Sequence, residues 1–177
     1  MNKNPIAEAQ KLLKSTRIEN PPVKVDKIAE KLKATLSFEP FEGEDGISGI
    51  LYRDEKQTVI GINSTHSKVR QRFTIAHEIG HLVLHDGDLF VDQTMRINFR
   101  DKRSSLAENQ HEIEANKFAA ELLMPREMIK REVMKRIAKK KVATESQLIT
   151  ELARVFDVSE QAMGYRLFNL GMISSPS

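Results

Sequence analysis

Residues 72–84 read RFTIAHEIGHLVL and contain the pattern H-E-x-x-H, spelled by His77, Glu78 and His81. Apolar side chains flank the pattern on almost every side, which predicts a buried helix. Residues four apart lie one turn above each other on a helix, so both imidazoles face the same way. Three ionisable groups on a buried helix are costly unless something pairs them. We therefore predict that His77 and His81 are ligands of a metal ion, and that the ion is zinc.

Glu78 has a different role in this pattern from the two histidines. It follows the first predicted ligand directly, so its side chain points to the side of the metal position. That placement suits a general base acting on a metal-bound water better than a third ligand. We predict that Glu78 is the catalytic base.

The chain has 177 residues, of which 40% are apolar, which is enough for one core. We expect a metallopeptidase-like domain over residues 1–125 and a C-terminal helical region over residues 126–177 that packs on it. There is no long apolar run and no secretory signal, which predicts a cytoplasmic protein without a membrane-spanning segment. Cysteine is absent, which excludes disulfides and thiolate metal ligands.

The net charge of +3 is small, but the basic residues gather between 130 and 141. A basic stretch of this kind either follows a phosphate backbone or forms the solvated face of a helix. The pattern favours the helix face.

The periodicity predicts an α+β fold that is mostly helical. Alternating segments at 35–41, 47–52 and 57–62 predict a small three-stranded antiparallel sheet, with the last two strands joined as a hairpin. Gly49 inside the middle segment indicates a bulge or a close backbone approach. Helical patterns follow or precede these strands at residues 5–16, 26–33, 66–84 and 108–123, and two more occupy residues 145–171.

A catalytic zinc site takes three protein ligands and leaves one position open, so a third ligand is needed. The metzincin pattern would place a histidine at position 87, where this chain has Gly87, so that class is excluded. His85 is the nearest other candidate, but one straight helix cannot easily place three ligands around one ion. We expect the third ligand on the helix at 108–123.

That helix offers Glu112 and Glu114. Glu112 shares a stripe with small residues, which would let this helix press close to the metal helix. Glu114 shares its side with Lys117 and Glu121, which indicates a solvent-facing surface. We predict Glu112 as the third ligand, and Asn116, one turn beyond it, as a residue that orients a ligand.

The segments RFTIAHEIGH (72–81) and EIEANKFAAELLMP (112–125), in this order, resemble the ImmA/IrrE family of bacterial and phage metallopeptidases. Residues 152–171, LARVFDVSEQAMGYRLFNLG, are similar to the helical region that follows in that family. The matches span most of the chain from about Gly46 onward. The resemblance implies a zincin-like, gluzincin-type zinc site with His77 and His81 as ligands and Glu78 as base. The family motif also places its ligand at the first Glu of E-x-E-A-N, which is Glu112.

The resemblance further implies an endopeptidase that cleaves a helix-turn-helix repressor of the Xre type and thereby relieves repression. Such a substrate would lie extended against an edge of the small sheet, and Ile47–Tyr52 is the candidate strand.

Two other functions compete with this one. Residues 145–171 imitate a helix-turn-helix, which would make the chain a DNA-binding regulator. The second helix of this segment, however, offers only Arg166 as a strong base-reading residue. We therefore expect the segment to pack against the rest of the protein or to dock a partner. The other alternative is a protein-binding module that keeps zinc for structure, and Glu78 argues against it because a structural site needs no base.

Overall fold

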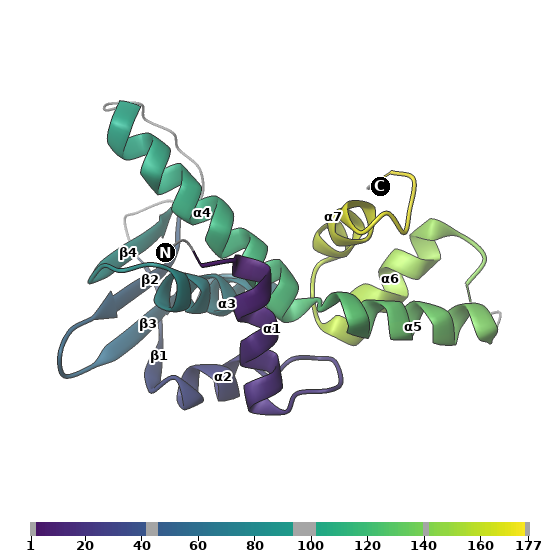
Figure 1. Ribbon diagram of the computed structural model, residues 1–177, viewed down its shortest axis with the longest axis horizontal. Coiled ribbons are helices and arrows are strands. Elements are labelled where there is room, and N and C mark those ends of the chain that lie inside the picture. The colour runs from purple at the N-terminus through teal and green to yellow at the C-terminus, as the bar shows by residue number, and fades with distance from the viewer. Residues whose placement is uncertain (1–2, 42–45, 94–101, 140–141, 176–177) are drawn as a thin grey trace.

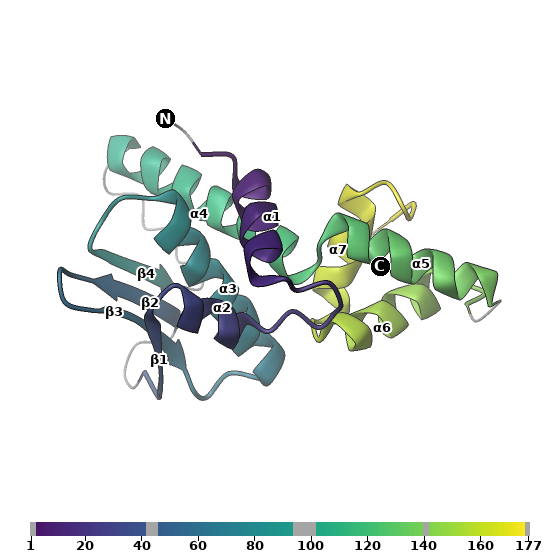
Figure 2. The same ribbon diagram turned by 60° about the horizontal axis from the view of Figure 1, so that its bottom comes forward.

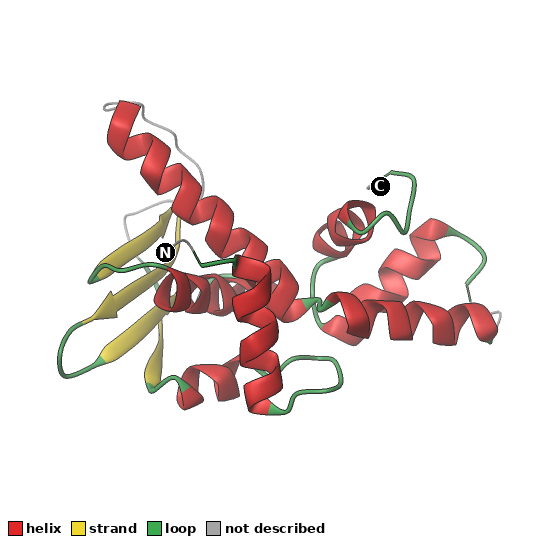
Figure 3. Cartoon of the chain, in the orientation of Figure 1, coloured by secondary structure: helices red, strands yellow, loops and turns green. Residues whose placement is uncertain are grey.

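The computed structural model describes residues 3–41, 46–93, 102–139 and 142–175 (Figure 1). The expected α+β class, mostly helical, is confirmed, and the strands lie at one end of the molecule (Figure 3). The elements are, in chain order, α1 (Pro5–Thr16), α2 (Val25–Lys31), β1 (Ala34–Glu39), β2 (Ile47–Arg53), β3 (Thr58–Asn63), α3 (Lys68–Leu84), β4 (Leu89–Gln93), α4 (Lys102–Leu123), α5 (Arg126–Ala138), α6 (Glu145–Phe156) and α7 (Glu160–Asn169).

The sheet differs from the predicted one in strand number and in direction. It has four strands in the order β1-β3-β2-β4. The β2–β3 hairpin is confirmed, but β1 runs parallel to β3, and β4 adds a strand antiparallel to β2. Alternation of side chains reveals which face of a strand is buried, but neither its neighbour nor its direction. Because β2 lies between β3 and β4, the prediction that Ile47–Tyr52 is an edge open to substrate is wrong.

Helix α3 packs on one face of the sheet, against β2 and β3. The contact is closest at Gly49, where a β-bulge interrupts the pairing of β2 with β4. A Cβ at Gly49 would lie 2.4 Å from Thr74 Cγ2 and 2.7 Å from Glu78 Oε1, both distances too short for any side chain. The close approach predicted for Gly49 is therefore confirmed, and the strand backbone forms a wall against the middle of α3.

Helix α4 packs against α3, and α1 packs against α4 in turn (Figure 1, Figure 2). The α3–α4 contact is tight at Gly80, where a Cβ would lie 3.1 Å from Ala115 Cα. Ala115 and Ala119 are fully buried, and Ala115 of α4 faces Gly80 of α3. The stripe of small residues therefore brings α4 close to α3, as the sequence predicts.

Helices α5–α7 lie at the other end of α4 from the sheet (Figure 1). Thr144 caps α6 by accepting a hydrogen bond from Gln147 N at 3.2 Å, and Ser159 caps α7 in the same way from Ala162 N. Gln147 Oε1 in turn accepts a hydrogen bond at 2.9 Å from Ala143 N, one residue before the cap. Within the described parts of the chain, none of the helices is long and apolar enough to cross a membrane.

Candidate metal centre

Three side chains from two helices converge at the contact between α3 and α4. His77 Nε2 and His81 Nε2, from α3, lie 3.0 Å apart. Glu112, from α4, places one carboxylate oxygen 3.1 Å from His77 Nε2 and the other 3.1 Å from His81 Nε2. The structure thus brings together the three residues that the sequence nominates as ligands, and their ligand atoms form a group that could hold a metal ion.

The chemistry of this triangle suits a cation at its centre. Two N–H groups donating to Glu112 would face each other at the observed 3.0 Å, with like partial charges opposed. Three lone pairs directed at one cation remove that conflict. Zinc–ligand bonds of about 2.0–2.2 Å in tetrahedral geometry separate ligand atoms by roughly 3.3–3.6 Å, a few tenths of an ångström more than the 3.0–3.1 Å seen. Two imidazoles and one carboxylate also form a donor set typical of catalytic zinc sites.

His77 is held from behind by Asn116. His77 Nδ1 lies 3.2 Å from Asn116 Oδ1, so an Nδ1–H donates to the amide oxygen and leaves Nε2 with its lone pair toward the triangle. Asn116 lies one turn beyond Glu112 on α4, where the sequence places it. The residue is itself exposed, so one side of this contact is open to water.

His81 is held from behind by two residues instead of one. His81 Nδ1 lies 3.1 Å from His85 Nδ1, and His85 Nε2 lies 3.1 Å from Glu114 Oε2. His85 therefore sits on the far side of His81 from Glu112 and does not join the triangle. The prediction that Glu114 faces solvent is wrong, because Glu114 is only 7% exposed. His85 is the C-cap residue of α3 and has an extended backbone conformation. Its imidazole contacts the Nδ1 side of the His81 ring.

Glu78 is fully buried beside the triangle, and neither of its carboxylate oxygens has a hydrogen-bond partner. Burial is the largest influence on it and raises the pKa of Glu78 to about 8. The nearby charge of His77 opposes that rise, while Asp92 and Glu112 add to it. A carboxyl with a pKa near neutrality, and with no internal partner, can accept and release a proton at physiological pH.

Glu112 has the opposite electrostatics. Partial burial opposes its ionisation, but hydrogen bonds and charge from His77 and His81 lower the pKa of Glu112 to about 2. The carboxylate is therefore ionised at neutral pH. Its side chain is 40% exposed, so the triangle is reached from solvent on the Glu112 side.

The sequence did not nominate Asp92 or Phe90, which both come from β4. An Asp92 carboxylate oxygen lies within 4.8 Å of ligand atoms of His77 and Glu78, and burial raises the pKa of Asp92. The Phe90 ring stacks on His81 with centroids 4.7 Å apart. No sequence pattern marks either residue as part of the site. The strand that carries them, β4, was itself not predicted. The position of His85 did indicate a role at the site. His85 follows His81 by four residues, and His81 follows His77 by the same interval, so the three side chains recur once per helical turn.

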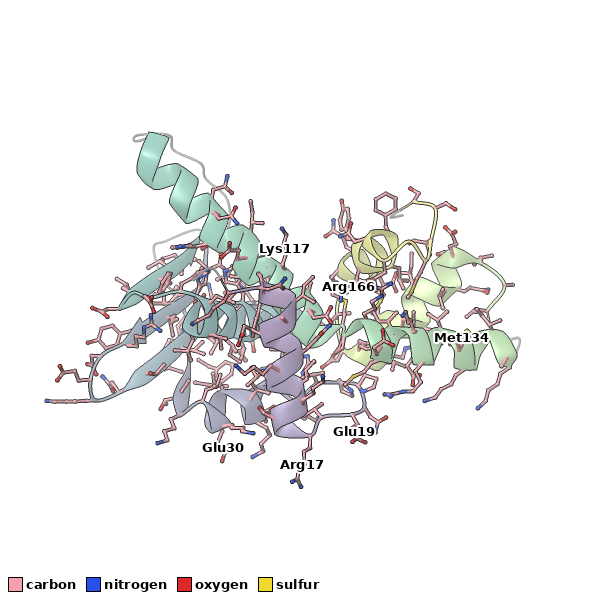
Figure 4. All side chains as sticks on the ribbon, viewed as in Figure 1. Arg17, Glu19, Glu30, Lys117, Met134 and Arg166 are labelled. Atoms are coloured by element: carbon pink, nitrogen blue, oxygen red, sulfur yellow. The ribbon has the colours of Figure 1, made fainter. Side chains whose placement is uncertain are left out.

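Arg166, the only strong base-reading candidate of α7, is turned toward the protein interior. Its guanidinium forms an ion pair with Glu121 and donates to the Met124 carbonyl at 3.0 Å, so it ties α7 to the end of α4 (Figure 4). The side chain is only 11% exposed. This placement leaves Arg166 unable to reach a base edge without breaking a buried ion pair.

Comparison with known proteins adds independent evidence. The model of a peptidase family described as the IrrE N-terminal-like domain matches residues 29–168. An uncharacterized immunity region protein (protein 2) of Bacillus phage phi105 is 28% identical over 156 residues, covering 87% of this chain and 89% of that protein.

Two further relatives are named radiation response metalloprotease IrrE. The protein from Deinococcus deserti is 37% identical over 134 residues, and the one from Deinococcus radiodurans is 35% identical over 133 residues. Each match covers 75% of this chain. The chain spans 42% and 36% of the length of these two relatives, respectively.

Proposed function

The chain belongs to the peptidase family described as the IrrE N-terminal-like domain, and from this membership we propose that it is a zinc-dependent endopeptidase. The observation that carries the proposal is the buried Glu78 carboxylate, partnerless beside three converging ligand atoms. A site that held zinc only for structure would gain nothing from a buried acid that costs free energy and makes no bond. We assign His77, His81 and Glu112 as zinc ligands and Glu78 as the base.

The residues divide the reaction between them. Bound zinc would supply Lewis acidity, which lowers the pKa of a coordinated water and polarises the scissile carbonyl. Glu78 accepts the proton of the attacking water and then delivers it to the departing amine nitrogen. Burial raises the pKa of Glu78, which makes its carboxylate a stronger base than an exposed one. Asn116 holds the His77 ring so that Nε2 stays directed at the ion.

The structure revises where an extended substrate would bind. Within the described residues, the outer strands of the sheet are β1 and β4. Strand β4 carries Phe90 and Asp92, which both adjoin the metal triangle, whereas β1 lies at the opposite edge. We propose that a substrate adds to the outer edge of β4, where main-chain pairing would bring a peptide bond alongside Glu78.

For the substrate we propose a transcriptional repressor of the Xre helix-turn-helix type, cleaved in the cytoplasm. Support comes from the family resemblance in the sequence and from the relative that is named as a phage immunity region protein. A bound repressor would present its own extended segment to β4. Generic unfolded proteins such as casein should therefore be cut slowly.

The test uses purified Xre-type repressors from the source organism as substrates. Incubation with the zinc-loaded chain should cut one of these repressors at one position, as mass spectrometry of the products would show. A chelator should abolish the cleavage, and one equivalent of zinc should restore it. Repressors that all stay intact while the chain demonstrably holds zinc would refute this choice of substrate.

A further inference from the structure

A continuous line of hydrogen bonds runs from His81 to a buried carboxylate on α4. His81 Nδ1 contacts His85 Nδ1 at 3.1 Å, and His85 Nε2 contacts Glu114 Oε2 at 3.1 Å. The other oxygen of Glu114 accepts a hydrogen bond from Gln110 Nε2 at 2.6 Å. All of these contacts lie on the side of His81 that faces away from Glu112.

The carboxylate end of the line favours one placement of its protons. An ionised carboxylate only accepts hydrogen bonds, so His85 must carry its proton on Nε2. Its Nδ1 is then a lone pair, which can only accept the proton on His81 Nδ1. When Nδ1 carries the single proton of a neutral His81, the lone pair is on Nε2. That atom is the one that lies 3.0 Å from His77 Nε2 and 3.1 Å from Glu112.

The line is rigidly held. His85 is only 5% exposed, and the His111 ring stacks on it with centroids 4.1 Å apart and an interplanar angle of 24°. Arg53, from β2, donates to the main-chain carbonyl of His85 at 2.7 Å and to that of Leu82 at 3.3 Å. His111 therefore fixes the side chain of His85 and Arg53 fixes its backbone. Together they keep the His85 imidazole oriented toward His81.

The support behind His77 is of a different kind. Asn116 makes a single contact, from an exposed position. A carboxamide can accept through its oxygen or donate through its nitrogen, so it tolerates either imidazole tautomer. The line behind His81 ends instead in a carboxylate, Glu114, which can only accept.

We propose that His85 and Glu114 are positioning residues that hold the proton of His81 on Nδ1 and thereby present the Nε2 lone pair to the metal. The proposal rests on the metal site assigned under the proposed function. It goes beyond that site because neither residue touches the metal position or the reacting atoms. Removing such an outer support typically weakens metal binding by about 10–100-fold.

The first test measures the zinc dissociation constant by competition with a chromogenic chelator. His85→Phe keeps a ring under His111 but removes both nitrogens, and it should raise the zinc Kd by about 10–100-fold. His85→Asn places an amide oxygen near the lost Nδ1 acceptor and should recover most of the affinity. Lys117→Ala, an exposed position on α4, is the matched control and should bind zinc as the wild type does.

The second test reads the tautomers directly, by nitrogen-15 NMR of the zinc-free protein with labelled histidine. It uses a Glu112→Ala background, so that no carboxylate competes for a proton on His81 Nε2. His81 should carry its proton on Nδ1, and His85 should carry its proton on Nε2. In Glu114→Gln, whose amide both donates and accepts, the His81 signals should shift toward a mixture of tautomers. A residue that only fills space would leave these signals unchanged.

Two results would overturn the proposal. One is a His81 protonated on Nε2 in the zinc-free Glu112→Ala variant, and the other is a His85→Phe variant that binds zinc as tightly as Lys117→Ala. Failure of the proposed function is separate, because a wild-type chain that binds no zinc would refute the metal site. The tautomer measurement, made without zinc, would still decide whether the line orders the protons. If His85→Phe does not fold, His85→Asn and Glu114→Gln carry the test.

Discussion

The two ends of this molecule bury different kinds of side chain. In the described residues, every buried polar or charged side chain belongs to the part with the sheet and helices α1–α4. The fully buried side chains of helices α5–α7 are apolar, among them Leu152, Phe156 and Met163, while the polar Arg166 is only partly buried. Burying a polar group is costly unless it is bonded, and Glu78 is not bonded at all. The difference indicates that the sheet and helices α1–α4 carry the functional site, whereas helices α5–α7 form an apolar core that contributes stability.

This comparison predicts two classes of variant. Changes in the polar cluster should remove function, even where the fold persists. Changes in the core of α5–α7 should remove stability, while the molecules that remain folded stay active. The predictions below run from the largest expected effect to the smallest.

Glu112→Ala should have the largest effect. It removes one ligand from the triangle, so bound zinc should fall well below one per chain. Cleavage should drop on the order of 10³-fold or more, because the metal and the base act as a unit. Metal analysis by mass spectrometry and the repressor cleavage rate measure the two effects. Lys117→Ala controls for the substitution of a charged residue on α4. Wild-type zinc content in Glu112→Ala would contradict the ligand assignment.

Leu152→Ala should affect only stability. Leu152 is fully buried in α6, and its truncation should lower the free energy of unfolding by about 2–5 kcal/mol. Denaturant unfolding measures this loss, with the exposed Arg154→Ala on the same helix as control. The kcat of the folded molecules should not change. A lower kcat at full folding would show that α5–α7 take part in catalysis and would break the comparison.

Gly49→Ala should have the smallest effect of the three, although it lies at the site. The added methyl would meet Thr74 and Glu78 at distances that force one of them to move, which should cost about 1–3 kcal/mol. The cleavage rate should fall by roughly tenfold, since a base displaced by a fraction of an ångström aligns poorly. Gly61→Ala is the matched control, because its methyl would meet nothing closer than Phe41 Cζ at 3.4 Å. Equal cleavage rates in the two variants would show that β2 does not position Glu78.

The sequence predicted the parts of the site that depend on short-range spacing. His77 and His81 are one helical turn apart, and Asn116 is one turn beyond Glu112, so helical geometry alone places them. The stripe of small residues on α4 likewise predicted the close contact at Gly80. These features follow from positions within one helix or from the shape of its surface.

The parts that sequence reasoning missed depend on elements far apart in the chain. Glu114 was assigned to solvent because its own helix places it beside Lys117 and Glu121, but His85 arrives from the end of α3 and buries it. Strand β4 was not predicted, because its five residues gain their order by pairing with β2. The parallel pairing of β1 with β3 skips the intervening β2, and no local pattern encodes such a choice.

The most direct test of the account is the repressor cleavage rate of zinc-loaded Glu78→Gln relative to the wild type. Glutamine keeps the size of the side chain and cannot take a proton from water. The variant should hold about one zinc per chain, since Glu78 is not a ligand in this account. Its cleavage rate should be lower by about 10²–10⁴-fold, the usual contribution of a general base. Cleavage by Glu78→Gln at the wild-type rate would contradict the account, because the buried carboxylate would then have no part in the reaction.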